Sequence, residues 1–269
     1  MTKGLLIYLL SALACFALCA QEADSIRREI DRRPSFGIYK DNYFTLGTTI
    51  GSKITRVNSD VKFQISMRQR LTNSVLPFHS YLFLFYTQKT FWNVFEESLP
   101  MHDMNFNPGI GWSRMIISKG RVVGNVTLLL EHESNGKDGE ASRSWNKVGV
   151  SANYYVNPTL MVHGKLFIPI IDGENNKDLL DYSGCLQFGI QKLPLNKKWV
   201  LNLTLVKRRG WNLNFNTIVE FGIHLKETAN QYLFVQYYNG YGESLLDYNR
   251  FSSRLRVGLL IRPTYFSDF

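Results

Sequence analysis

The sequence predicts an all-β fold, a twelve-stranded antiparallel transmembrane β-barrel of an outer membrane. Apolar and polar side chains alternate over runs much longer than the usual strand of about five or six residues, most clearly over residues 211–225. No run of about 18 apolar residues follows residue 20, so we expect no transmembrane helix in the mature chain. Strands with one apolar and one polar face must close into a barrel, because lipid cannot satisfy the backbone groups of an open edge.

The alternation has a period of two in several parts of the chain. Over residues 211–225 one face is mainly apolar, and the other carries mainly Asn, Glu, Gly and His. The same pattern occurs in residues 61–70, 182–191 and 252–262. These runs approach or exceed the nine to eleven residues, roughly, that a tilted strand needs to cross a bilayer. The twelve expected strands are residues 42–50, 61–71, 77–93, 105–117, 121–134, 144–157, 160–170, 180–192, 198–208, 211–226, 230–240 and 252–262.

Aromatic side chains near the expected strand ends are typical of the girdles at the two membrane surfaces. They are Tyr154, Tyr155, Trp199, Trp211, Tyr237 and Tyr238. The chain also ends in an aromatic residue, Phe269, which is common in outer-membrane barrels. With both termini in the periplasm, odd-numbered strands run outward, so the fifth strand ends at the cell surface.

The ends of the chain divide it into three expected parts. Residues 1–20 read as a secretory signal, with Lys3 before an apolar stretch and cleavage expected after Ala20. A lipoprotein using Cys15 or Cys19 is the alternative at this end. Residues 21–40, rich in Arg, Asp and Glu, are expected to form a periplasmic extension outside the barrel, which takes up residues 41–269. Removing the signal leaves only Cys185, so no internal disulfide is expected.

The formal net charge of +9 does not indicate a nucleic-acid partner. The basic residues are scattered, and neither a helix-turn-helix pattern nor an aromatic stacking platform is present. Scattered Lys and Arg also suit anionic lipid head groups or a solvated interior face. We expect a charge network that closes the barrel interior; its members are Glu131, Glu133, Arg254, Arg256 and Arg262. The sequence gives no evidence of an open pore.

Polar side chains continue the apolar face of the fifth and sixth strands near the cell surface. In residues 121–134 this face ends with His132 and Ser134, and in residues 144–157 it begins near Asn146. All three side chains should therefore point outward, towards lipid, on neighbouring strands joined by one loop. On parity alone they are equally a polar rim, where strands leave the bilayer.

A catalytic interpretation of these three residues has a clear chemical basis. Serine is a poor nucleophile until a base removes its proton, and histidine is the usual base. A third group must fix the imidazole tautomer, and the carbonyl oxygen of Asn146 can accept a hydrogen bond from the ring. A neutral partner also avoids placing a carboxylate beside lipid.

The segment Glu131-His-Glu-Ser-Asn-Gly, followed by Ser142-Arg-Ser-Trp-Asn146, resembles the active-site signature of the outer membrane phospholipase A family. Two further blocks resemble that family: Tyr86-Thr-Gln-Lys-Thr-Phe-Trp92 with Asn105-Phe-Asn-Pro108, and Gly240-Tyr-Gly-Glu-Ser-Leu-Leu-Asp-Tyr-Asn249. The blocks are spread over residues 86–249. The resemblance implies a serine nucleophile, a histidine base and an asparagine that orients it.

The resemblance assigns these roles by matching residue. Ser134 would be the nucleophile, His132 the general base and acid, and Asn146 the residue that orients His132. The backbone N–H groups of Ser134 and Gly136 would donate to the oxyanion.

The resemblance also implies dependence on Ca²⁺ and activity as a homodimer. The calcium ligands would be the backbone carbonyl of Lys137, the hydroxyl of Ser142 and the carbonyl of Ser98 from the partner subunit. Oxygen ligands of this kind, completed by waters, suit a hard cation. The cation's charge would stabilise the tetrahedral oxyanion.

The chain departs from the family pattern in the loop that would bind calcium. Lys137 stands where arginine is common, a change that a carbonyl ligand tolerates. Gly139 stands where an acidic residue is expected, with Asp138 and Glu140 on either side. This departure puts in doubt the calcium affinity of the monomer rather than catalysis.

Gln88 shares its predicted outward face with Tyr86, and an amide that faces lipid is costly unless it is paired. The resemblance implies that Gln88 makes a hydrogen bond across the dimer interface. An inverted parity, with Gln88 in the interior, is the alternative. Tyr86 is either a wall of the substrate groove or an ordinary lipid-facing aromatic.

Taken together, these features predict a calcium-dependent phospholipase in the outer membrane of a Gram-negative bacterium, with its active site at the cell-surface leaflet. Its substrates would be membrane glycerophospholipids, and the family's activities are those of phospholipases A1 and A2 and of lysophospholipase. The competing class is a non-enzymatic outer-membrane barrel, either a channel or a surface-binding protein. A barrel protease is disfavoured, since no acidic pair faces an external cleft.

Overall fold

The computed structural model describes residues 21–170, 174–226 and 230–262. The expected signal peptide and Phe269 lie outside these ranges. Among the described residues, no helix is long and apolar enough to cross a membrane.

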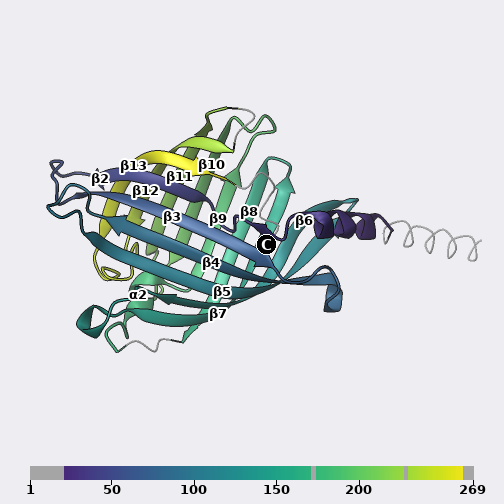
Figure 1. Ribbon diagram of the computed structural model, residues 1–269, viewed down its shortest axis with the longest axis horizontal. Coiled ribbons are helices and arrows are strands. Elements are labelled where there is room, and N and C mark those ends of the chain that lie inside the picture. Colours follow the sequence, from purple (N-terminus) through teal and green to yellow (C-terminus); the bar gives the residue numbers. More distant parts are fainter. Residues whose placement is uncertain (1–20, 171–173, 227–229, 263–269) are drawn as a thin grey trace, which may run out of the picture.

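Twelve antiparallel strands, β2–β13, form a closed barrel (Figure 1). Each strand pairs with its neighbours in sequence, and β13 pairs with β2 to close the cylinder. The strands are β2 (Asn42–Thr49), β3 (Ser59–Arg70), β4 (Ser80–Trp92), β5 (Met101–Ser118), β6 (Arg121–Ser134), β7 (Ser144–Asn157), β8 (Leu160–Ile170), β9 (Leu186–Lys192), β10 (Trp199–Lys207), β11 (Phe215–His224), β12 (Gln231–Gly240) and β13 (Ser252–Ile261). The predicted fold class and strand number are confirmed.

Apart from a helix at residues 21–32, the remaining elements are short. A two-residue strand, β1 (Phe36–Gly37), pairs with β3 beyond the end of β2. Two 3₁₀ turns, η1 (Pro77–His79) and η2 (Gly139–Ala141), lie between strands. One short helix, α2 (Leu179–Ser183), lies between β8 and β9.

Two expected strands are too long in the sequence analysis. The expected strand 180–192 begins only at Leu186, because residues 179–183 form α2, whose first residue Leu179 is fully buried. The expected strand 211–226 is reduced to β11, and the preceding loop leaves Trp211 fully exposed. Alternation continues into that loop, but no neighbouring strand extends far enough to pair with it.

The two faces of the strands match the predicted parity. On β6 and β7 the side chains of Leu128, Leu130 and Val148 are about half exposed on the outer surface. The intervening Thr127 and Lys147 are buried in the interior. In a membrane the exposed apolar side chains face lipid, which explains why a barrel of this size leaves so many of them uncovered.

Ion pairs form a charge network in the barrel interior, as predicted. Their members are Glu131 with Lys165, Glu133 with Lys147, Asp60 with Arg254 and Arg256, Glu243 with Lys62 and Arg256, and Asp41 with Arg262. Opposite charges that meet inside a low-dielectric interior offset the cost of their desolvation. They leave a polar cavity of about 880 Å³ within the barrel.

Two of the expected girdle aromatics point inward instead. Tyr155 and Tyr238 line the interior cavity, and Tyr238 donates a hydrogen bond to the carbonyl of Tyr241. A tyrosine is compatible with either face of a barrel strand, because its hydroxyl satisfies a polar interior and its ring suits lipid. The sequence pattern of adjacent tyrosines therefore did not fix which one faces the membrane.

The loop between β12 and β13 folds into the extracellular end of the barrel. Glu243 is buried there, and its carboxylate accepts hydrogen bonds from Lys62 (3.0 Å) and Arg256 (2.5 Å). Burial raises the pKa of the Glu243 carboxyl, but these two cations outweigh it and hold the pKa well below its usual range. Leu245 and Tyr248 of the same loop pack against Trp145 and Leu179. The loop thus covers the extracellular end of the interior.

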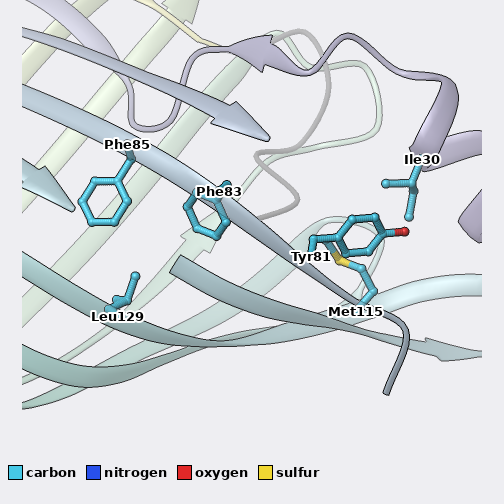
Figure 2. Close-up of a cluster of buried hydrophobic side chains, with 6 residues drawn as sticks. All are labelled: Ile30, Tyr81, Phe83, Phe85, Met115 and Leu129. Atoms are coloured by element: carbon cyan, nitrogen blue, oxygen red, sulfur yellow. The ribbon is translucent and has the colours of Figure 1, made fainter. Parts of the chain in front are cut away.

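The N-terminal segment closes part of the opposite end. Residues 21–32 are helical and extend from the barrel at the end opposite the β2–β3 hairpin (Figure 1). Ile30 packs into a buried apolar cluster inside the barrel, completed by Tyr81, Phe83, Phe85, Met115 and Leu129 (Figure 2). Arg70 donates hydrogen bonds to the carbonyls of Ile30 (2.5 Å), Asp31 (2.8 Å) and Arg33 (3.0 Å).

Residues 21–40, expected to form an extension outside the barrel, therefore also contribute side chains to its interior. Besides Ile30, the ring of Tyr39 stacks on Phe85, and Lys40 lines the interior cavity. The charged residues of the segment lie mainly on the exposed side of its helix. The charged composition did not reveal the few apolar residues that anchor the segment inside.

Candidate active site

His132 and Asn146 face each other across the β6–β7 pair. The register places the two residues directly opposite, and 2.9 Å separates His132 Nδ1 from Asn146 Oδ1. Both residues are half-buried, on the outer face near the extracellular end of the barrel. With Oδ1 as the acceptor, Nδ1 carries the hydrogen and Nε2 is left as the basic nitrogen.

Ser134 lies two residues beyond His132 on β6 and shares its outward face. Residues i and i+2 of a strand point to the same face and lie roughly 6–7 Å apart, so their side chains can approach each other. The Ser134 hydroxyl makes no hydrogen bond to any other described residue. Catalytic hydrogen bonds are often long until substrate is bound.

Charged side chains brace the same two strands from the interior. Glu133, between His132 and Ser134, accepts hydrogen bonds from Lys147 Nζ (2.6 Å) and Trp145 Nε1 (2.9 Å). Because strand side chains alternate, this interior brace holds β6 and β7 in the register that pairs His132 with Asn146. The sequence predicted that Glu133 faces the interior, but not which residues it would bind.

Asn135 closes the loop of residues 135–143. Its Oδ1 accepts a hydrogen bond from the Arg143 N–H (2.9 Å), and its Nδ2 donates to the Ala141 carbonyl (2.9 Å). The backbone N–H of Asn135 also donates to the Arg143 carbonyl (3.0 Å). Only 2% of Asn135 is exposed. The sequence analysis missed this residue; the signal was a short, amide-bearing side chain directly after the strand, a residue type that bonds to nearby backbone.

Gly136 occupies a position that only glycine fits. Its φ is +63°, and a Cβ there would lie 2.9 Å from the Phe106 ring. Both conditions exclude a side chain. The turn directs the chain away from β6 immediately after Ser134 and brings its backbone close to the serine.

The residues expected to hold calcium lie in two loops. Lys137 and Ser142 belong to the same loop, where Lys137 Nζ donates to the His102 carbonyl (2.8 Å) and η2 separates the two residues. Ser98 lies in the β4–β5 loop, exposed and with φ of +63°. Trp92 fixes this loop through a hydrogen bond from Nε1 to the Leu99 carbonyl (2.8 Å).

The chemistry of the 135–143 loop fits a hard cation. The described part of the chain has no group of three His, Cys, Asp or Glu side chains that could hold a metal. A cation bound in this loop would take backbone carbonyl and hydroxyl oxygens as ligands, and such ligands suit calcium better than a transition metal. The side chains of Asp138 and Glu140 are on exposed residues of the same loop and add negative charge beside it.

An apolar groove of about 660 Å³ runs along the outer face beside His132 and Asn146. Its walls come from β1, β3, β4, β5 and β6, and include Phe36, Met67, Leu84, Tyr86, Ile110 and Leu130. The groove is open towards the space that lipid occupies in a membrane. Its apolar lining suits a hydrocarbon chain.

Gln88 lies on the outer face of β4, next to this groove. Its Oε1 accepts a hydrogen bond from the Tyr86 hydroxyl (3.0 Å), and its Nε2 donates to Thr90 Oγ1 (3.2 Å). Thr87 and Lys89, its neighbours in sequence, line the interior instead. Gln88 thus belongs to a short polar ladder on an otherwise apolar face.

His102, at the start of β5, forms an ion pair with Asp247. Its Nε2 lies 2.5 Å from Asp247 Oδ2, and so joins the start of β5 to the β12–β13 loop. Asp103 and Asn105 of β5 also accept hydrogen bonds from the backbone N–H groups of Leu246 and Leu245. The β12–β13 loop is therefore fixed to the strand that carries the Lys137 contact.

A model of the family described as phospholipase A1 matches residues 38–261. The chain belongs to the phospholipase A1 family. Phospholipase A1 of Escherichia coli K12 is 30% identical over 213 residues, which are 77% of this chain and 71% of the relative. Phospholipase A1 of Proteus vulgaris is 28% identical and covers 96% of this chain and 98% of its own.

Solved structures of outer membrane phospholipase A share the fold of this family member. The Escherichia coli protein has a TM-score of 0.74 at 26% identity, covering 87% of this chain and 95% of its own. The Salmonella typhi protein, solved as a dimer with bound calcium, has a TM-score of 0.73 at 26% identity. The match covers 85% of this chain and 92% of the Salmonella typhi chain. The chain is thus an outer-membrane barrel of a Gram-negative phospholipase family.

Proposed function

We propose that this phospholipase A1 family member hydrolyses acyl ester bonds of membrane glycerophospholipids with a Ser134–His132–Asn146 triad. The observation that carries the proposal is the 2.9 Å contact between His132 and Asn146 on the lipid-facing surface, with Ser134 on the same face. Structures of the Escherichia coli relative include an asparagine-to-alanine active-site mutant. An outward-facing nucleophile in a membrane meets lipid esters before any other substrate.

In the proposed reaction, Ser134 Oγ attacks the ester carbonyl while His132 Nε2 takes the hydroxyl proton. Asn146 keeps the Nδ1 hydrogen in place, so Nε2 points to the serine. His132 then gives its proton to the departing glycerol oxygen, and the acyl group stays on Ser134. A water, deprotonated by His132, attacks the acyl enzyme and releases the fatty acid.

The negative charge on the carbonyl oxygen would be met by backbone N–H groups of Ser134 and Gly136. Calcium would be held by the Lys137 carbonyl, the Ser142 hydroxyl and the carbonyl of Ser98 from a second copy. When bound there, the ion supplies positive charge beside the oxyanion. The Salmonella typhi relative was solved as a dimer with bound calcium, which supports a role for calcium and for a second copy in this proposal.

The 660 Å³ groove beside His132 is the proposed site of the acyl chain, with Tyr86 as part of its wall. Seating a second copy against the same face would cover the groove, and Gln88 would then donate a hydrogen bond across the interface. Activity would therefore depend on association. Full activity of a monomer held apart by dilution would contradict this part of the proposal.

The cleavable bonds include those of phospholipase A1, phospholipase A2 and lysophospholipase substrates, because an open groove accepts more than one ester position. The competing function, a passive channel, is disfavoured by the buried Glu243 and Leu245 at the extracellular end of the interior. A channel would need that end to be open.

The test is fatty-acid release from mixed micelles of phosphatidylcholine and detergent in the presence of Ca²⁺. The wild type should release fatty acid, chelation of Ca²⁺ should stop the release, and Ser134→Ala and His132→Ala should each lower the rate by about 10³-fold or more. Ser52→Ala, on an exposed loop far from the site, is the matched control and should retain the wild-type rate. Absence of release by the wild type, or wild-type rates for both variants, would overturn the proposal.

A further inference from the structure

Two extracellular loops on the rim opposite the catalytic strands combine basic and apolar residues and contain no Asp or Glu. They are the β2–β3 loop, residues 50–58, and the β10–β11 loop, residues 208–214. In the closed barrel β12 lies six strands from β6 in either direction, and both loops flank it. Their basic residues are Lys53, Arg56, Arg208 and Arg209.

The apolar side chains of these loops are not packed against the protein. Their exposed fractions are 71% for Ile54, 77% for Val57, 103% for Trp211 and 91% for Leu213. These four apolar side chains are largely exposed at the end of the barrel. Packing within the protein therefore does not stabilise them. A partially apolar environment at the membrane surface would cover them.

Contacts through the start of β13 join the two loops into one surface. The Ile50 N–H donates to the Ser253 carbonyl (2.9 Å). The Phe251 ring lies 5.4 Å from that of Tyr241, and the Arg208 guanidinium lies 4.8 Å from the same ring. We call residues 50–58, 208–214 and 250–251 the basic apolar rim.

The charge of this rim differs from that of the catalytic side. The β4–β5 loop carries Glu96 and Glu97, and the β6–β7 loop carries Asp138 and Glu140. The net positive charge of the protein is therefore not spread evenly over its extracellular end. Among the extracellular loops, only the β2–β3 and β10–β11 loops present cations without acidic residues in the same loop.

The cations of the rim are available to an external anion. Arg209 contacts Asp181 at 3.0 Å, and Arg250 contacts Asp247 at 3.4 Å, but the two arginine side chains are 71% and 78% exposed. Ion pairs this exposed contribute little, so a phosphate can replace the carboxylate or share the guanidinium. Lys53 and Arg56 are exposed as well.

We propose that the basic apolar rim binds anionic, phosphate-bearing lipid of the outer leaflet. Apolar tips such as Trp211 and Ile54 enter the interface, while the neighbouring arginines and lysines bind phosphate, a combination that binds charged membrane surfaces elsewhere. Because the rim lies across the barrel from His132, the lipid held there is a bound partner and not the substrate. The proposal stands whether or not the protein hydrolyses lipid.

The test measures hydrogen–deuterium exchange of the barrel in nanodiscs of diether phosphatidylcholine, with or without diether phosphatidic acid. Ether lipids remain intact in the presence of a phospholipase. Adding phosphatidic acid should slow exchange in residues 50–58 and 208–214 by about threefold or more, and high salt should reverse the effect. Exchange in residues 93–100 should not change.

The matched variant carries Lys53→Gln, Arg56→Gln, Arg208→Gln and Arg209→Gln, and its control carries Lys197→Gln and Lys198→Gln in the periplasmic β9–β10 turn. The rim variant should lose the slowing and the control should keep it. Equal exchange in the two lipid mixtures, equal slowing in both variants, or slowing of residues 93–100 alone would overturn the proposal. Salt reversal in the wild type provides a test that does not depend on how the variants fold.

Discussion

His132 Nδ1 and Asn146 Oδ1 meet at 2.9 Å across two strands, on the face that the barrel turns towards lipid. The contact joins residues 14 positions apart through a single hairpin. Because the amide oxygen can only accept, the contact places the ring hydrogen on Nδ1 and leaves Nε2 as the proposed base. Its position beside an apolar groove connects the chemistry to a lipid substrate.

Replacement of Asn146 tests this orienting contact. Asn146→Ala should lower kcat by about tenfold to hundredfold, ~1.4–2.7 kcal/mol of barrier, because the imidazole then samples unproductive orientations. KM should change less than kcat, since Asn146 supplies only one residue of the groove and the apolar walls remain. The control is Asn153→Ala, on the same strand but bonded in the interior to Asn125, which should leave kcat within about twofold.

Asn135 is expected to control the conformation of the proposed calcium loop, residues 135–143. Asn135→Ala removes two buried hydrogen bonds that tie Arg143 and Ala141 to the end of β6, and each is costly to leave unmade. The Ca²⁺ concentration for half-maximal hydrolysis should rise by about tenfold, and hydrogen exchange in residues 137–142 should accelerate. Unchanged calcium dependence would show that the loop is held by other contacts.

Substitutions of Glu133 and Lys147, the interior ion pair behind His132 and Asn146, should have coupled effects on the free energy of unfolding. Glu133→Gln leaves the buried Lys147 without its carboxylate, which should cost about 3–5 kcal/mol of unfolding free energy in urea. Adding Lys147→Met should restore most of that loss. A double-mutant cycle that finds additive effects would contradict the pairing.

Low pH should release the β12–β13 loop. The hydrogen bond with His102 lowers the pKa of the Asp247 carboxyl below its usual range, an effect that burial partly opposes, and Arg250 adds to it. A lowered carboxyl pKa gives stability that is present above the unfolded value of about 4 and is lost as pH falls through the folded value. The rate of hydrogen exchange of the backbone amides of residues 241–250 should therefore increase only below about pH 4. In Asp247→Asn it should be fast already at neutral pH and show no acid transition.

The sequence predicted the parts of the fold that depend on alternation. Lipid on one face and polar groups on the other impose a strict period of two, so strand parity and the outward direction of His132 and Asn146 could be read directly. The roles of the site residues came from resemblance to a family and not from parity, which a polar rim would satisfy equally well.

Segments that fold back into the barrel could not be predicted in this way. Ile30, Tyr39 and Leu245 are anchored by long-range contacts that leave no period in the sequence. The short helix α2 interrupts an alternating run because Leu179 is buried against residues far along the chain. For the same reason the ion pair of His102 with Asp247, 145 positions away, was invisible before the fold was known.

Covalent labelling of the nucleophile tests the central claim most directly. A long-chain alkylsulfonyl fluoride, added with Ca²⁺ to the protein in micelles, should modify Ser134 at one group per chain and stop fatty-acid release in step with labelling. His132→Ala should prevent the modification, since the hydroxyl then lacks its base. Hydrolysis that continues with Ser134 fully labelled, or inactivation with the label on another residue, would contradict the account.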